Sequence, residues 1–149
     1  MDFAVINPNL LVGPCPYDSE EFQYLKSQSV TAILSLLTPD DEEELGVRGI
    51  VEATRAELAY RNVAVNDFDN LDLKRKLPAC VEALDDLLKN GHKVYVHCTA
   101  GVNRSPTVVA AYLHWRLHWP LEKALDHLKG RRQCCPRGDL IQLATRSMH

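Results

Sequence analysis

Short apolar segments alternate with longer amphipathic segments along this chain, and that alternation restricts its fold more than any other feature. Apolar runs predict strands at residues 3–6, 10–12, 31–37, 63–65 and 93–97. Apolar residues at helical spacing predict helices at residues 18–28, 49–59, 73–90, 105–118, 120–130 and 138–149. Strands alternating with helices predict an α/β fold whose central, mostly parallel sheet has about five strands and is flanked by helices on both faces.

Two polar stretches interrupt this pattern. Pro39 and the acidic residues 40–44 are expected to end the third strand, and the acidic run is interpreted as a solvated surface. Residues 66–72 are rich in Asn and Asp and are expected to form a loop.

The length and composition predict one globular domain spanning residues 1–149. The chain is 46% hydrophobic and 25% charged, which is typical of a globular protein with a real core. Its net charge of -3 gives no reason to expect binding to nucleic acid through bulk positive charge. No apolar run approaches the ~20 residues that a membrane-spanning helix needs.

The cysteines indicate free thiols in a reducing compartment. There are five, and their spacing fits neither a metal site nor a disulfide framework. Since residues 1–4 do not begin a signal peptide, a cytoplasmic location is expected, or an organelle if an upstream transit segment has been removed. We expect no metal or other cofactor.

One turn between a strand and a helix carries the reactive residue types. His97 and Cys98 follow the strand at 93–97, and five residues later Arg104 and Ser105 begin a helix. Such a loop, which contains Gly101, aims backbone N–H groups at one point and forms an anion site at the helix N-terminus. The predicted phosphate-binding residues are Thr99, Ala100, Gly101, Val102, Asn103 and Arg104.

Each reactive side chain then has an expected role. The amide dipoles and the guanidinium favour the thiolate of Cys98, which is the nucleophilic form. Arg104 grips two phosphoryl oxygens with its planar fork, and Ser105 hydrogen-bonds the sulfur. His97 is expected to orient the loop. A lone cysteine before a helix is usually a small buried hydrophobe, and only the combination with Arg104 and Ser105 at this spacing favours catalysis.

The stretch from His97 to Pro106 resembles the loop of the protein tyrosine phosphatase superfamily, His-Cys-x5-Arg-Ser/Thr, and the small chain is similar to its dual-specificity branch. Residues 11–13, 67–69, 77–78 and 131–136 extend the resemblance to the catalytic domain of plant glucan (starch) phosphatases and, more distantly, to laforin. The resemblance implies a dual-specificity phosphatase-like fold, a thiophosphoryl intermediate on Cys98 and no metal.

A departing alkoxide or phenoxide also needs a proton. Asp67, Asp69 and Asp72 are all candidates in the loop at 66–72, and the residues alone do not choose among them. The resemblance implies that Asp67 is the general acid and that Phe68 shapes the entrance.

The substrate stays open between three alternatives. Asn103 resembles protein-directed dual-specificity enzymes, and residues 43–47 offer no aromatic ring to stack on a sugar, which favours a phosphotyrosine, phosphoserine or phosphothreonine protein. A phosphorylated glucan or another non-protein phosphate is the alternative. An inactive phosphate-binding module is a third, although the nucleophile, the arginine and a candidate acid are all present.

The oligomeric state is not predicted. A reversible disulfide between Cys15 and Cys98 is a further hypothesis.

Overall fold

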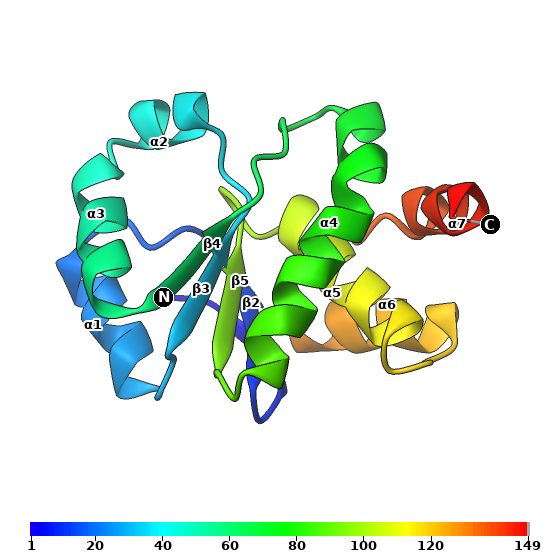
Figure 1. The fold of residues 1–149 in the computed structure, drawn as a ribbon, viewed down its shortest axis with the longest axis horizontal. Coiled ribbons are helices and arrows are strands. Elements are labelled where there is room, and N and C mark those ends of the chain that lie inside the picture. The colour runs from blue at the N-terminus through cyan, green and yellow to red at the C-terminus, as the bar shows by residue number, and fades with distance from the viewer. Residues whose placement is uncertain (149) are drawn as a thin grey trace.

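A single mixed sheet organises the chain in the computed structural model, which describes residues 1–148 (Figure 1). Its strands lie in the order β1-β2-β5-β3-β4. β1 and β2 are antiparallel, and the other neighbours are parallel. The strands are β1 (Ala4–Asn7), β2 (Leu10–Gly13), β3 (Ala32–Ser35), β4 (Ala59–Asn62) and β5 (Val94–His97). The predicted α/β fold with a mostly parallel sheet of about five strands is confirmed.

Helices cover both faces of this sheet, as predicted. Figure 1 shows α1 and α3 on one face and α4, α5 and α6 on the other, with α7 against α4 and α5. The helices are α1 (Ser19–Ser27), α2 (Pro39–Leu45), α3 (Arg48–Glu57), α4 (Asn70–Lys89), α5 (Arg104–Trp115), α6 (Leu121–Arg131) and α7 (Gly138–Ser147). None of the helices in residues 1–148 combines the length and hydrophobicity needed to cross a membrane.

The central strand β5 positions the reactive loop. It lies between β2 and β3, and all four of its residues are buried. Tyr95 packs on one face with Leu11 and Ile33, whereas Val94 and Val96 join the larger core beneath α4 and α5. Since side chains alternate along a strand, this apolar filling on both faces fixes the register of β5. The position of His97, where the following turn begins, is therefore fixed by the packing of β5.

The acidic run follows the end of β3 at Ser35, as expected, but it forms a helix that was not predicted. Residues 39–45 form α2, with Thr38 as its N-cap and Pro39 in its first turn. A capping box supports this helix, because the Thr38 hydroxyl accepts from the Asp41 amide and the Asp41 carboxylate accepts from the Thr38 amide. Thr-x-x-Asp after a strand is a sequence signature of such a helix start. It was overlooked because the run was interpreted from its acidic composition alone.

Two predicted boundaries in the middle of the chain were also wrong. The fourth strand is Ala59–Asn62 rather than residues 63–65, because α3 ends at Glu57 and Ala59 and Tyr60 pair with β3. Residues 63–65 instead run on beside β3, with hydrogen bonds to Ser35 and Leu36. The loop predicted at 66–72 ends early, since Asp69 caps α4 and the helix begins at Asn70.

The helix after the reactive loop is shorter than predicted. α5 ends at Trp115 rather than at residue 118. His118 adopts a left-handed conformation with a φ of 61°, which is incompatible with continuing the helix. Pro120 is the N-cap of α6 rather than its first residue.

Candidate active site

The β5–α5 turn requires glycine at position 101. Gly101 has a φ of 70°, a left-handed conformation that glycine adopts without strain. A Cβ at this position would also lie 2.5 Å from the carbonyl carbon of Gly13. The turn after β2 thus packs directly against the reactive loop, and any side chain at position 101 would push the two apart.

The carbonyl groups of the loop are held from outside it. The Thr99 carbonyl accepts from the Cys15 amide at 3.0 Å, and the Val102 carbonyl accepts from the Cys135 amide at 2.8 Å. The Arg132 guanidinium donates to the Ala100 carbonyl at 3.2 Å. Since the N–H of a peptide plane points opposite to its C=O, these anchors turn the following amides away from the surrounding elements and into the loop.

Those amides are left without a partner in the protein. Within the described part of the chain, the backbone N–H groups of residues 99–103 donate no hydrogen bond to another residue. Ala100 and Val102 are exposed, so a ligand from solvent can reach these donors, and successive backbone N–H groups of this kind form an anion-binding concavity. The loop therefore has the geometry of a cradle for a tetrahedral oxyanion.

Cys98 lies at the base of this cradle, beside the residues predicted to assist it. Its sulfur is 3.3 Å from the Ser105 hydroxyl oxygen, and both residues are buried. The His97 ring bonds to the Cys98 carbonyl through Nδ1 at 3.2 Å, and that nitrogen carries the proton because a carbonyl only accepts. Burial lowers the pKa of His97 to about 4. His97 is thus a neutral ring that holds the loop at neutral pH.

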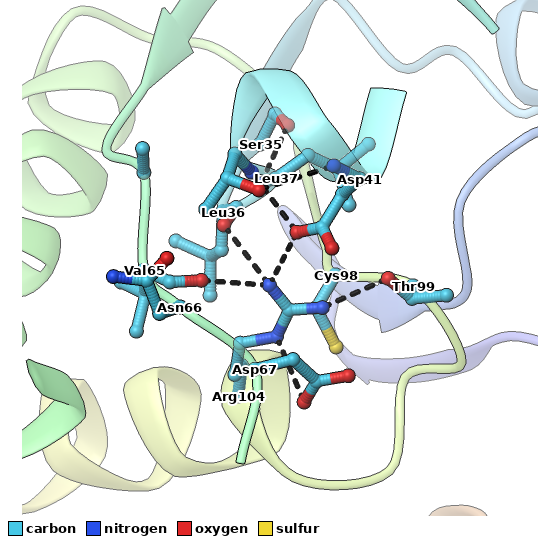
Figure 2. A network of polar contacts seen from close by, with 12 residues as sticks. Ser35, Leu36, Leu37, Asp41, Val65, Asn66, Asp67, Cys98, Thr99 and Arg104 are labelled. Atoms are coloured by element: carbon cyan, nitrogen blue, oxygen red, sulfur yellow. Dashed lines mark hydrogen bonds and ion pairs between the residues drawn. The ribbon is translucent and has the colours of Figure 1, made fainter. Parts of the chain in front are cut away.

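Arg104 is almost completely buried, at 3% exposure, and its nitrogens face different partners (Figure 2). Nη1 donates to the Val65 carbonyl at 2.7 Å, to the Asp41 carboxylate at 2.8 Å and to the Leu36 carbonyl at 3.4 Å. Nη2 donates to the Thr99 hydroxyl at 2.8 Å. Nη1 therefore donates only to protein acceptors, and these bonds fix the plane of the guanidinium.

The remaining nitrogen of Arg104 has no hydrogen-bond acceptor. Nε is buried and makes no hydrogen bond within the described residues, although the Asp67 carboxylate lies 3.5 Å away. A buried guanidinium N–H without an acceptor is costly unless a ligand supplies one. Arg104 and Cys98 line the same cavity, of about 220 Å³, together with Phe68 and Val102. A phosphoryl oxygen there would satisfy Nε.

Of the three candidate acids, only Asp67 lies against the cavity that holds Cys98. The Asp69 carboxylate caps α4 by accepting from the Asp72 amide at 3.0 Å. The Asp72 carboxylate accepts from the Asn66 backbone and from Lys76, and these bonds lower its pKa. Asp67 is followed by Phe68, which has a φ of 58° and is 91% exposed at the mouth. The other two aspartates are therefore held at the start of α4, whereas the Asp67 carboxylate accepts from the Phe68 amide at 3.1 Å and lies 3.5 Å from Nε of Arg104.

Sequence reasoning missed Asp41, which it placed on a solvated surface. Its carboxylate reaches from the first turn of α2 to Arg104, and Figure 2 shows the guanidinium between Asp41 and Asp67. Burial alone would raise the pKa of Asp41, but hydrogen bonds from Arg104 and Thr38 outweigh it and lower the pKa. The ionised Asp41 carboxylate therefore adds to the free energy of unfolding. This contribution is fully present above pH ~4 and is lost as the pH falls through the lowered pKa of Asp41. The capping-box signature could have placed Asp41 at a helix start, but not beside Arg104.

Replacing Asp41 with asparagine tests whether it positions Arg104. We expect kcat/KM on p-nitrophenyl phosphate to fall about 10- to 100-fold, because a small displacement of a catalytic group has an effect of this size. The loss should appear in kcat as well as KM. Asp40→Asn, an exposed change in the same helical turn, should leave both parameters unchanged. Equal values for the two variants would show that Asp41 does not position Arg104.

Cys15 lies behind the loop. Its amide holds the Thr99 carbonyl, and its thiol is buried. Burial and, next, the nearby Cys98 raise the pKa of Cys15 to about 12. The disulfide with Cys98 stays a prediction, and mass spectrometry after mild peroxide treatment would detect it.

The comparisons with known proteins agree with this geometry. Residues 15–144 match the family described as dual specificity phosphatase, catalytic domain. The chain is 36% identical over 149 residues to Phosphoglucan phosphatase DSP4, amyloplastic, of Castanea sativa, covering 97% of this chain and 40% of that protein. It is 31% identical over 127 residues to human Dual specificity protein phosphatase 5, covering 85% of this chain and 30% of that protein. The chain spans less than half the length of these relatives.

A solved structure supports the same assignment. The Cydia Pomonella PTP-2 phosphatase superimposes with a TM-score of 0.78 at 26% identity, covering 97% of this chain and 89% of that one. The family match covers most of the chain, and the described loop carries the cysteine and the arginine at the motif's spacing. The chain therefore belongs to the family of dual specificity phosphatase catalytic domains.

Proposed function

We propose that this domain hydrolyses phosphomonoesters through a covalent intermediate on Cys98. The observation that carries the proposal is the set of donors without protein acceptors, namely the loop amides of residues 99–103 and Nε of Arg104. Of the residues that carry these donors, Ala100, Val102, Asn103 and Arg104 line the cavity that holds Cys98. Such donors stabilise the charge on the equatorial oxygens of a transferring phosphoryl group.

In the first step, the Cys98 thiolate attacks phosphorus in line with the leaving oxygen. The S–P bond forms as the P–O bond breaks, and Asp67 transfers its proton to the departing oxygen. Asp67 lies 3.5 Å from Nε of Arg104 in the free domain. A phosphoryl oxygen that binds Nε would replace Asp67 there and release it toward the leaving group.

In the second step, water attacks the phosphorus of the thiophosphoryl group. Asp67, now ionised, takes a proton from that water, and the S–P bond breaks to release inorganic phosphate. The Ser105 hydroxyl, 3.3 Å from the sulfur, donates to it and makes the thiolate a better leaving group.

Two classes of substrate have support. The cavity wall is apolar at Phe68, Ala100 and Val102, which suits the ring of phosphotyrosine in a phosphoprotein. A phosphorylated glucan is supported by the names of two plant relatives. DSP4 of Castanea sativa is 36% identical, and Phosphoglucan phosphatase LSF1, chloroplastic, of Arabidopsis thaliana is 34% identical, each over 97% of this chain. Those names place the relatives in the amyloplast and the chloroplast, which would favour an organellar location for a glucan-directed enzyme.

The proposal is tested by the dependence of the rate on the leaving group. The wild-type domain should hydrolyse both p-nitrophenyl phosphate and phenyl phosphate, with inhibition by vanadate. Asp67→Asn should lower kcat on phenyl phosphate about 100-fold or more, because general acid catalysis has this magnitude. The loss on p-nitrophenyl phosphate should be smaller, since p-nitrophenolate departs with little need for a proton.

Asp126→Asn, an exposed change on α6, is the matched control and should behave as wild type. Equal losses on the two substrates would refute the acid role of Asp67. A folded wild-type domain that hydrolysed neither substrate would refute the proposed activity.

A further inference from the structure

One peptide plane of the reactive loop is freer to rotate than its neighbours. The Thr99 and Val102 carbonyls accept from backbone amides outside the loop, which hold their planes. The plane between Ala100 and Gly101 ends at a glycine, and glycine adopts positive and negative φ about equally readily. The backbone itself therefore does little to keep this plane from turning over.

The orientation of this plane decides what it presents to a phosphate. The Ala100 carbonyl points out of the loop to the Arg132 guanidinium, so the Gly101 N–H, on the opposite side of the same plane, points into the cradle. A half-turn of the plane would exchange the two groups and place a carbonyl oxygen against the bound phosphate. A carbonyl only accepts hydrogen bonds, as phosphoryl oxygens do, so the turned loop would repel the oxyanion.

Arg132 makes the one hydrogen bond that holds the Ala100 carbonyl among the described residues. Its Nη2 donates to that carbonyl at 3.2 Å, and its Nη1 donates to the Asp2 carbonyl. Arg132 directly follows α6, so its guanidinium connects the end of that helix with β5–α5 turn and with the residues before β1. Unlike the backbone anchors of the loop, this contact belongs to a side chain and can be removed by substitution.

The charge of Arg132 is not neutralised by a carboxylate. Arg132 forms no ion pair within the described residues, and its buried Nε has no hydrogen-bond acceptor there. A hydrogen bond from a charged donor is roughly twice as strong as a neutral one, which strengthens its hold on the Ala100 carbonyl. Arg132 does not line the cavity that holds Cys98, so it can act on a bound phosphate only through the loop.

We infer that Arg132 is a positioning residue that keeps the Ala100–Gly101 plane in the orientation that binds phosphate. This inference rests on the proposed phosphatase function and adds a residue from outside the cavity to it. Without Arg132 the loop would divide between two orientations, of which only one binds an oxyanion. The apparent affinity for any phosphate would fall in proportion to the fraction of molecules in that orientation. Saturating substrate would restore the orientation, so kcat would be retained.

Arg132→Met tests this inference, because methionine has an unbranched side chain and no hydrogen-bond donor. We expect KM on p-nitrophenyl phosphate and Kd for tungstate to rise by the same factor, about 10- to 100-fold, the effect of losing a hydrogen bond from a charged group. The value of kcat should stay within about twofold of wild type, because the loop with bound substrate is the same in both proteins. Arg132→Gln, which removes the charge and shortens the side chain, should raise both constants as well.

Arg131→Met is the matched control, since it removes an equal charge from the exposed neighbouring residue, and it should leave KM and Kd unchanged. Thermal unfolding of each variant separates a change in binding from a loss of fold, and Arg132→Gln decides the matter if Arg132→Met does not fold. Wild-type tungstate affinity in a folded Arg132 variant, or a fall in kcat at unchanged KM, would overturn the positioning role. Tungstate binding needs no turnover. A wild-type domain that bound tungstate but hydrolysed nothing would therefore refute the proposed function, while the tungstate constants would still decide the role of Arg132.

Discussion

Replacing Cys98 with serine is expected to abolish turnover while the cradle still binds its ligand. A serine hydroxyl is a far weaker nucleophile than a thiolate. Asp67 could not act as its base, because the same step needs Asp67 in its protonated form for the leaving group. The neutral His97 ring is turned toward the Cys98 carbonyl through Nδ1. We expect kcat on p-nitrophenyl phosphate to fall about 10⁴-fold or more, the effect of removing a nucleophile.

Binding should survive this change because other groups make the cradle. The loop amides belong to the backbone, and Arg104 is fixed by Asp41, Thr99 and two carbonyl groups. Isothermal titration with tungstate should therefore give a Kd within a few-fold of wild type. Cys80→Ala, a buried change on α4, is the control for loss of a thiol and should keep its turnover. Residual kcat of Cys98→Ser within tenfold of wild type would show that another group attacks phosphorus.

The sequence was sufficient to predict the parts of this site that lie next to one another along the chain. The strand, the cysteine, the five loop residues and the arginine occupy residues 93–104, so their relative positions follow from local geometry. The apolar strand patterns likewise predicted the parallel sheet, because buried strands carry little else. Phe68 and Asp67 were predicted only through a family resemblance.

Contacts between distant segments could not be predicted in the same way. Arg104 is held by the Leu36 and Val65 carbonyls, and any residue offers a carbonyl, so no side-chain pattern marks these positions. Asp41 is one of five consecutive acidic residues, and only the capping box distinguishes it from its neighbours. The anchors from Cys15 and Cys135 use backbone amides and leave no trace in the residue types.

Replacing Arg104 with lysine is expected to impair both binding and chemistry, in contrast to Cys98→Ser. Lysine keeps one positive charge but has a single nitrogen, whereas Arg104 binds the protein through Nη1 and Nη2 and still has Nε without a protein acceptor. A lysine ammonium that paired with Asp41 could not also bind a phosphoryl oxygen, because it lacks the rigid fork of N–H donors that a guanidinium has. We expect kcat/KM on p-nitrophenyl phosphate to fall roughly 10³-fold, since one preorganised donor contributes about 10²–10³.

The two variants together separate binding from attack. Arg104→Lys should weaken tungstate binding markedly, while Cys98→Ser should not, and both should have little turnover. Arg61→Lys, in an exposed 4.0 Å pair with Asp86, is the matched control and should leave Kd and kcat/KM unchanged. Tungstate affinity equal to wild type in a folded Arg104→Lys domain would mean that the loop amides alone hold the oxyanion. The buried guanidinium would then act only on the transition state, and the unpaired Nε would no longer count as evidence for a bound phosphate.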